Sequence, residues 1–193
     1  MPNLLPPSIT VSQIGRAASE VGMAGLLGGT LFGRLALHPS VSAISDPRER
    51  GRVVNAAWRR YGTVNALSLL AVTGGWLGAR ADEARDANLS PRERRLARAK
   101  DGFVAATVVT GLATMVEGIR FSKLAPEGAV PLTDGDHTAP GATPPQARAK
   151  QRLNVLGVLS LGADLGLVAA NAALSQENFR RPPARRLLPR LRS

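Results

Sequence analysis

The uncharged run at residues 61–79, YGTVNALSLLAVTGGWLGA, restricts the possible folds of this chain more than any other feature. It is nineteen residues long, and arginines flank it on both sides. About 20 residues of α-helix cross the ~30 Å hydrocarbon core of a bilayer, so a run of this length is a candidate membrane span. Trp58 and Tyr61 stand near one end and Trp76 near the other, where amphipathic rings prefer the headgroup level. The run therefore predicts an integral membrane protein.

Three weaker apolar runs accompany this one, and together they predict an all-α fold, an antiparallel four-helix bundle in the membrane. The expected spans are residues 17–37, 58–79, 102–120 and 153–175. They form one transmembrane domain, residues 1–178, which is followed by a basic, Pro-rich tail at 179–193. The connector at 125–146 is rich in Pro, Gly and acidic residues, so we expect an irregular loop outside the membrane.

Three Pro-containing motifs mark where helices begin. Residues 46–49 (DPRE), 90–93 (SPRE) and 143–146 (TPPQ) each place a capping residue before a Pro, with Glu or Gln at the third helical position. A helix that begins at Asp46 and includes the uncharged run has about 33 residues and a length of ~50 Å. That length exceeds a bilayer, so we expect the second, third and fourth helices to extend beyond it.

The first helix is expected to run from Ser8 to His38. Pro39 should end it, because a proline disfavours the helical conformation of the residue before it. Small residues recur at four-residue intervals in the first and fourth helices, at Gly25, Gly29, Gly33, Gly162 and Gly166. Glycines at this spacing let a neighbouring helix approach closely, which is the usual basis of helix packing in membranes.

Composition excludes several classes of function. The net charge is +11, but the basic residues lie between and beyond the apolar runs, and aromatic residues make up only 4% of the chain. A nucleic-acid surface with interleaved aromatic residues is therefore not expected, and the basic residues should meet anionic lipid headgroups. The absence of cysteine excludes disulfides, thiol catalysis and iron–sulfur or Cys-based zinc sites.

The distribution of basic residues predicts the topology. When Arg59 and Arg60, which precede the uncharged run, are counted with the first connector, Lys and Arg number 14 on the side of the N-terminus, the second connector and the tail, against nine in the first and third connectors. Because cytoplasmic segments are richer in these residues, both termini are expected in the cytoplasm. The N-terminal residues do not resemble a cleavable signal peptide. We therefore predict a multi-pass protein of the cell (inner) membrane.

Asp164 is the most informative polar residue. It lies about eleven residues into the fourth apolar run, near the bilayer midplane, where a carboxylate costs at least ~2.5 kcal/mol and usually faces the bundle interior. Ser160 and Asn171 share its face, and Asn65 of the second helix is a candidate partner. A proton or ion relay, or a ligand contact, is one interpretation. We favour the other, a hydrogen bond between helices that fixes their register, with Asn65, Ser68, Thr110 or Thr114 as the partner.

A second group of polar residues is expected at the outer membrane face. The topology brings Arg34, His38, Glu117 and Arg120 to that level, where a cluster of salt bridges is expected. His38 beside Glu117 could form a proton-transfer pair or half of a metal site. The chain has only two histidines, however, and we predict neither a metal site nor a cofactor. Motifs of hydrolases, phosphate loops and dinucleotide sites are absent from the sequence.

The Gly-rich first helix ends in Leu31-Phe32-Gly33 and is followed by His38-Pro39 and three more helices. This layout resembles small four-helix membrane proteins of the anthrone-oxygenase-like type. The resemblance implies a four-helix membrane fold and either an oxygenase or a protein without assigned activity. The long helical extensions and the basic tail depart from the compact pattern of that family, so no oxygenase mechanism is transferred to these residues.

Three functions are compatible with this sequence. The leading hypothesis is a non-catalytic accessory or scaffold subunit of a larger membrane complex or a homo-oligomer, because packing faces are abundant and reactive groups few. The first alternative is a small proton or ion transporter that uses Asp164. The second is a membrane oxidoreductase that acts on a lipophilic substrate. The expected partners are anionic lipids and other membrane subunits or copies of the chain.

Overall fold

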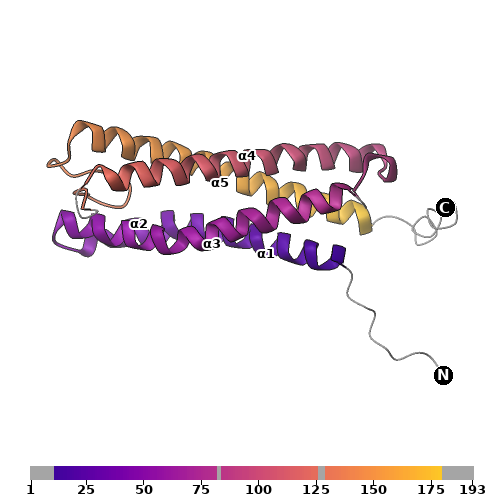
Figure 1. Ribbon diagram of the computed structural model, residues 1–193, viewed down its shortest axis with the longest axis horizontal. Coiled ribbons are helices and arrows are strands. Elements are labelled where there is room, and N and C mark those ends of the chain that lie inside the picture. Colours follow the sequence, from indigo (N-terminus) through magenta and orange to yellow (C-terminus); the bar gives the residue numbers. More distant parts are fainter. Residues whose placement is uncertain (1–10, 82–83, 126–128, 180–193) are drawn as a thin grey trace, which may run out of the picture.

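The computed structural model describes residues 11–81, 84–125 and 129–179, and these residues are almost entirely helical. Four long helices make up the bundle: α1 (Val11–Phe32), α3 (Pro47–Ala81), α4 (Pro91–Lys123) and α5 (Pro144–Phe179). Figure 1 shows them as two layers, in which α4 packs chiefly on α5 and α1 chiefly on α3. The predicted all-α helical bundle is confirmed. The predicted tail lies outside the described residues except for Phe179.

The helix starts follow the predicted capping motifs. The backbone N–H of Arg48 donates to the Asp46 carboxylate at the start of α3 (3.0 Å). At the start of α4, Glu93 N–H donates to Ser90 Oγ (3.3 Å) while Ser90 N–H donates to Glu93 Oε2 (2.8 Å), which is a complete capping box. At the start of α5, Thr143 N–H donates to the side chain of Gln146 (2.9 Å). These local bonds explain why α3 and α4 begin well before their apolar runs.

The prediction that the first helix ends at His38 is wrong. Helical backbone continues through a π-helical segment, η1 (Gly33–Leu37), then α2 (His38–Ser40) and a 3₁₀ turn, η2 (Val41–Ala43). In the π-helical segment the N–H of His38 donates to the Gly33 carbonyl, one residue further back than in an α-helix. This wider turn accommodates Pro39, which has no N–H and whose ring would crowd the preceding turn. The predicted start at Ser8 lies outside the described residues.

The core has two parts. One hydrophobic cluster fills the middle of the bundle and the end near Trp76, and it includes Leu26, Val72 and Leu167. The second lies at the opposite end, where the long connector folds onto the helices and buries Val130 and Leu132. A short 3₁₀ turn, η3 (Asp86–Asn88), connects α3 to α4 at the Trp76 end. Between residues 129 and 143 the long connector is irregular apart from one isolated bridge, and it closes one end of the bundle.

The outer faces of all four long helices carry exposed apolar side chains. They include Val21, Phe32, Leu67, Leu70, Leu77, Val109, Leu112, Ile119, Val155, Val158, Leu159 and Leu165. Soluble monomers rarely expose contiguous apolar surface on this scale. Among the described residues, two helices are both long and apolar enough to cross a membrane, at Pro91–Lys123 and Pro144–Glu177. The two further spans predicted in α1 and α3 remain predictions.

Candidate functional site: a cavity inside the bundle

A cavity of about 380 Å³ lies between the helices and reaches from the long connector to the middle of α5. All four long helices contribute to its wall. Its apolar lining includes Leu26, Leu69, Met115, Phe121 and Leu153. Its polar lining includes Arg34, His38, Tyr61, Asn65, Asp136, Lys150 and Asp164. This volume falls within the range of small-molecule sites, roughly 300–1,000 Å³, and the mixture of apolar wall with a few polar groups is typical of them.

His38 closes the connector end of the cavity through two hydrogen bonds that fix its protonation. The indole Nε1 of Trp58 donates to His38 Nε2 (3.0 Å), and His38 Nδ1 lies 2.9 Å from Asp136 Oδ1. An indole N–H can only donate, so Nε2 must be the unprotonated nitrogen and Nδ1 must carry the proton. Burial lowers the pKa of His38 below 6.5, and the positive charge of Lys150 lowers it further, against the opposite effect of Asp136. His38 is therefore neutral near pH 7.

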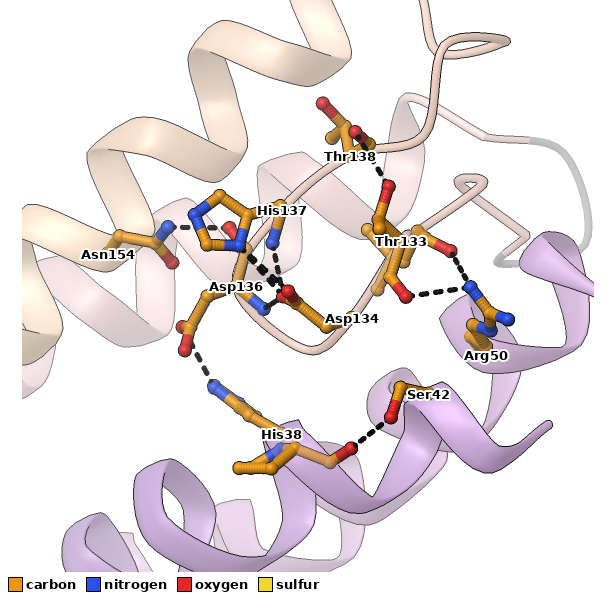
Figure 2. A network of polar contacts seen from close by, with 11 residues as sticks. His38, Ser42, Arg50, Thr133, Asp134, Asp136, His137, Thr138 and Asn154 are labelled. Atoms are coloured by element: carbon orange, nitrogen blue, oxygen red, sulfur yellow. Dashed lines mark hydrogen bonds and ion pairs between the residues drawn. The ribbon is translucent and has the colours of Figure 1, made fainter.

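The connector is held in place around Asp136, as Figure 2 shows. Asp134 Oδ1 accepts from the backbone N–H groups of Asp136 (2.7 Å) and His137 (2.8 Å), which fixes a tight turn. The Asn154 side chain on α5 donates to the Asp136 carbonyl (2.7 Å). On the other side, Gly135 N–H donates to the His38 carbonyl (2.9 Å). The turn thus ties α2 to α5 and points the Asp136 carboxylate at the imidazole.

Two glycines of the first helical segment make room for the aromatic residues of α3. A side chain at Gly29 would overlap the Tyr61 ring, and one at Gly33 would overlap the Trp58 ring. Trp58 in turn contacts both His38 and Tyr61 edge to face, with ring centroids 5.7 Å apart in each pair. These contacts place the aromatic row against α1 and in the wall of the cavity.

The remaining predicted packing glycines have different surroundings. Gly25 faces the Ser68 side chain, and a side chain at Gly166 would overlap the Phe103 ring. A Cβ atom at Gly162 would meet nothing within 4 Å. A Cβ atom at Gly75 would overlap the Gly15 carbonyl, so the backbones of α1 and α3 lie close there, and neither glycine was among the predicted packing residues.

Two cations lie beside the connector in the cavity wall. Arg34 Nη2 donates to the Asn154 carbonyl (2.8 Å), and the absent side chain of Gly157 leaves space for the guanidinium. Lys150 is only 6% exposed, yet it makes no hydrogen bond or ion pair within the described part of the chain. Asp136 and Asp134 lie near enough to favour its charged form, but neither is hydrogen-bonded to it, and removing an ammonium group from water is costly.

Asp164 lies at the far end of the cavity and is 4% exposed. Its Oδ1 accepts from the Thr107 hydroxyl on α4 (3.2 Å), so its hydrogen-bond partner differs from the four candidates named from the sequence. Asn65 lines the same cavity, and Ser160 Oγ lies 3.5 Å from Thr114 Oγ1.

Asn171, which was assigned to the same face as Asp164, is engaged elsewhere. It accepts from Lys100 Nζ (2.7 Å) toward the Trp76 end of the bundle. The predicted polar stripe on α5 is therefore divided between the cavity and the opposite end.

The predicted outer cluster of four charged residues divides into two groups. Arg34 and His38 line the cavity, as described above. Glu117 is directed to the other side of α4, where it pairs with Arg120 (3.6 Å) and Arg152 (3.9 Å). His38 and Glu117 therefore do not form the proton-transfer pair considered above. Among the described residues, no group of three or more His, Asp or Glu side chains could hold a metal ion.

Sequence reasoning did not select Asp136 or Lys150 as site residues. The partners His38 and Asp136 are 98 residues apart, and no local pattern joins them. Lys150 is one of only three lysines and precedes the fourth apolar run closely, which is the one sequence signal that could have drawn attention to it.

Comparisons of the chain with protein-family models, with curated proteins and with solved structures find no match.

Proposed function

We propose that this chain is a multi-pass membrane protein that binds a small amphipathic molecule in the cavity between its helices. In this proposal the four helices cross the membrane in alternating directions, with both termini in the cytoplasm, and the chain acts as a non-catalytic accessory subunit. The observation that carries the proposal is that the exposed faces of the helices carry apolar side chains while the cavity between them has polar groups in its wall. The outer faces carry exposed apolar side chains, whereas the buried residues His38, Thr107, Lys150 and Asp164 line one cavity between the helices.

The experiment uses a pair of glycines on α4. Gly118 lines the cavity, and a Cβ atom there would meet nothing within 4 Å, so Gly118→Phe should fill the cavity without disturbing the helices. Gly102 has equally open surroundings but does not line the cavity, so Gly102→Phe is the matched control. Each full-length chain is purified in native lipid nanodiscs, and its bound small molecules are extracted and compared by mass spectrometry.

We expect a specific molecule to co-purify with the wild type and with Gly102→Phe, and to be depleted at least tenfold in Gly118→Phe. The proposal is contradicted if the three extracts are the same. A bound pigment or quinone in the wild type would instead favour the oxidoreductase alternative.

A second candidate function is a scaffold subunit, and the open faces of α3 favour it. Cβ atoms at Gly74 and Gly78, one turn apart, would meet nothing within 4 Å. Such a surface fits a second membrane helix. Native mass spectrometry of the wild type and Gly78→Leu in nanodiscs tests this candidate. A wild type that is strictly monomeric and without other subunits contradicts it.

Ion transport through the cavity is tested at Asp164, which lines its far end. If the chain transports protons or ions, Asp164→Asn should abolish the flux measured in liposomes. Equal flux with wild type and variant removes that alternative.

A further inference from the structure

We infer that the cavity binds a single-chain or single-ring carboxylate, whose anionic group lies between Arg34 and Lys150 and whose apolar part extends toward Asp164. This inference rests on the proposed ligand-binding function and names the class of ligand.

Lys150 is the first observation. Its side chain is in the cavity wall and is 94% shielded from solvent, because the residue is 6% exposed. The nearest carboxylates are occupied otherwise: Asp136 accepts from His38, and Asp134 accepts from two backbone N–H groups and from His137. Neither forms an ion pair with Lys150 within the described residues. An acceptor supplied from the cavity would complete the hydrogen bonding of this ammonium group.

Arg34 is the second observation. It lines the same end of the cavity, and one of its nitrogens donates to the Asn154 carbonyl. A guanidinium carries five N–H donors, so the bond to Asn154 leaves donors on the same group for a ligand. Planar guanidinium groups match the geometry of a carboxylate, and such charge-assisted bonds are about twice as strong as neutral ones.

The rest of this end is unsuited to a cationic head group. His38 is a neutral acceptor whose two nitrogens are already bonded to Trp58 and Asp136. Arg59 also belongs to the wall, so the connector end presents Arg34, Arg59 and Lys150 against the carboxylates of Asp136 and the nearby Asp134. The local excess of positive charge favours an anion.

The size of the cavity limits the ligand. A volume of about 380 Å³ is near the lower end of small-molecule sites, roughly 300–1,000 Å³. Beyond Arg34 and Lys150 the wall includes the apolar side chains of Leu26, Leu69 and Met115, and polar groups such as Thr107 and Asp164 return at its far end. A two-chain phospholipid does not fit these limits, whereas a medium-length fatty acid or an aromatic acid does.

The test is equilibrium binding of radiolabelled decanoate to the full-length chain in nanodiscs, with binding to empty nanodiscs subtracted. Unlabelled decanoate, decanol and decyl phosphate are the competitors. We expect one saturable site per chain from which decanoate displaces the label and decanol at the same concentration does not. Equal competition by decanol overturns the inference. Stronger competition by decyl phosphate than by decanoate also overturns it, because the site would then prefer a phosphate to a carboxylate.

Two variants identify the site. Lys150→Met should weaken decanoate binding at least tenfold, while Lys150→Arg, which keeps the charge, should retain part of the affinity. Lys123→Met removes the same charge from an exposed position and should bind like the wild type. Unchanged binding by Lys150→Met overturns the inference, provided that its melting temperature shows a folded protein. If Lys150→Arg and Lys150→Met lose affinity equally, the charge is not what binds the ligand, and the inference is also overturned.

The inference and the proposed function fail in different ways. If Gly118→Phe retains the co-purifying molecule and also binds decanoate like the wild type, the cavity is not a binding site and both fail. If the wild type loses a neutral amphiphile on Gly118→Phe but shows no saturable decanoate binding, the cavity binds a ligand that is not an anion.

Discussion

Each end of this bundle contains one tryptophan, and the two ends differ in whether their buried cations have bonded acceptors within the protein. At one end, Trp76 Nε1 donates to Asp101 Oδ1 (2.7 Å), and Asp101 also pairs with Arg80 (3.2 Å). Lys100 stands 4.1 Å from the centroid of the Trp76 ring and donates to Asn171. Every cation named here has an acceptor within the protein.

At the other end, Trp58 donates to a neutral imidazole, and the nearby Lys150 has no bonded partner in the described part of the chain. Trp58 and Lys150 both line the cavity, whereas Trp76 and Lys100 do not. The buried charges at the Trp76 end are therefore bonded within the protein, whereas the Trp58 end is where we propose that a ligand binds.

The largest expected effect is a difference in stability between substitutions of the two buried lysines, Lys100 and Lys150. Lys100→Met removes a charge-assisted hydrogen bond and a cation–π contact, so it should lower the free energy of unfolding by about 2–3 kcal/mol. In the ligand-free protein, Lys150→Met replaces a buried charge that makes no hydrogen bond by an apolar group and should raise the free energy of unfolding by about 1 kcal/mol. Thermal unfolding of both variants in nanodiscs shows whether each substitution lowers or raises the free energy of unfolding. Equal destabilisation would show that Lys150 has a structural partner and would break the comparison.

The next effect concerns the packing of Trp58 against Gly33 of η1. Gly33→Leu would overlap the Trp58 ring, and overpacking of this kind costs about 1–3 kcal/mol. Because the displaced indole can no longer reach His38, ligand binding should weaken as well. Gly28→Leu is the control, since a Cβ atom at Gly28 would meet nothing within 4 Å. Melting temperature and decanoate binding are measured together, and equal values for the two variants would contradict the assigned packing.

Trp58→Phe should keep the ring contact and lose only the hydrogen bond to His38 Nε2. The expected loss is about 1 kcal/mol, because the net contribution of one such bond is small. The variant should also raise the pKa of His38, since Nε2 becomes free to bind a proton. The chain has two histidines, so the NMR titration of His38 can be assigned with His137→Asn. An unchanged pKa would contradict the tautomer derived from the Trp58 bond.

The smallest effect is the dependence of stability on pH. The pKa of His38 is lower in the folded chain than its ordinary value of 6.5. Between these two values the unfolded state binds more protons, so stability rises with pH up to about 6.5 and is lost as the pH falls below it. The slope in this range should be smaller in His38→Gln than in the wild type, as measured by melting temperature against pH. The same slope in both proteins would assign the acid sensitivity to another group.

More of the fold than of the candidate site could be predicted from the sequence. The helix starts depend on local side chains, such as the Ser90–Glu93 capping box, and local chemistry can be read from sequence. The end of the first helix could not, because the π-helical segment and the adjoining His38 contact residues far away in the sequence: Gly33 lies against Trp58 of α3, and Gly135 of the connector donates to the His38 carbonyl. The pairing of His38 with Asp136 joins residues far apart in the chain, through a connector that its composition suggested was only an irregular loop.

The most direct test of a ligand at the Trp58 end is solid-state NMR of the full-length chain in nanodiscs. The chain carries ¹⁵N in its three lysine side chains and is loaded with decanoate that carries ¹³C in the carboxyl group. We predict dipolar dephasing between the carboxyl carbon and one lysine nitrogen, which is lost in Lys150→Met and retained in Lys123→Met. Absence of dephasing in the wild type, or its persistence in Lys150→Met, would contradict a carboxylate site at Lys150.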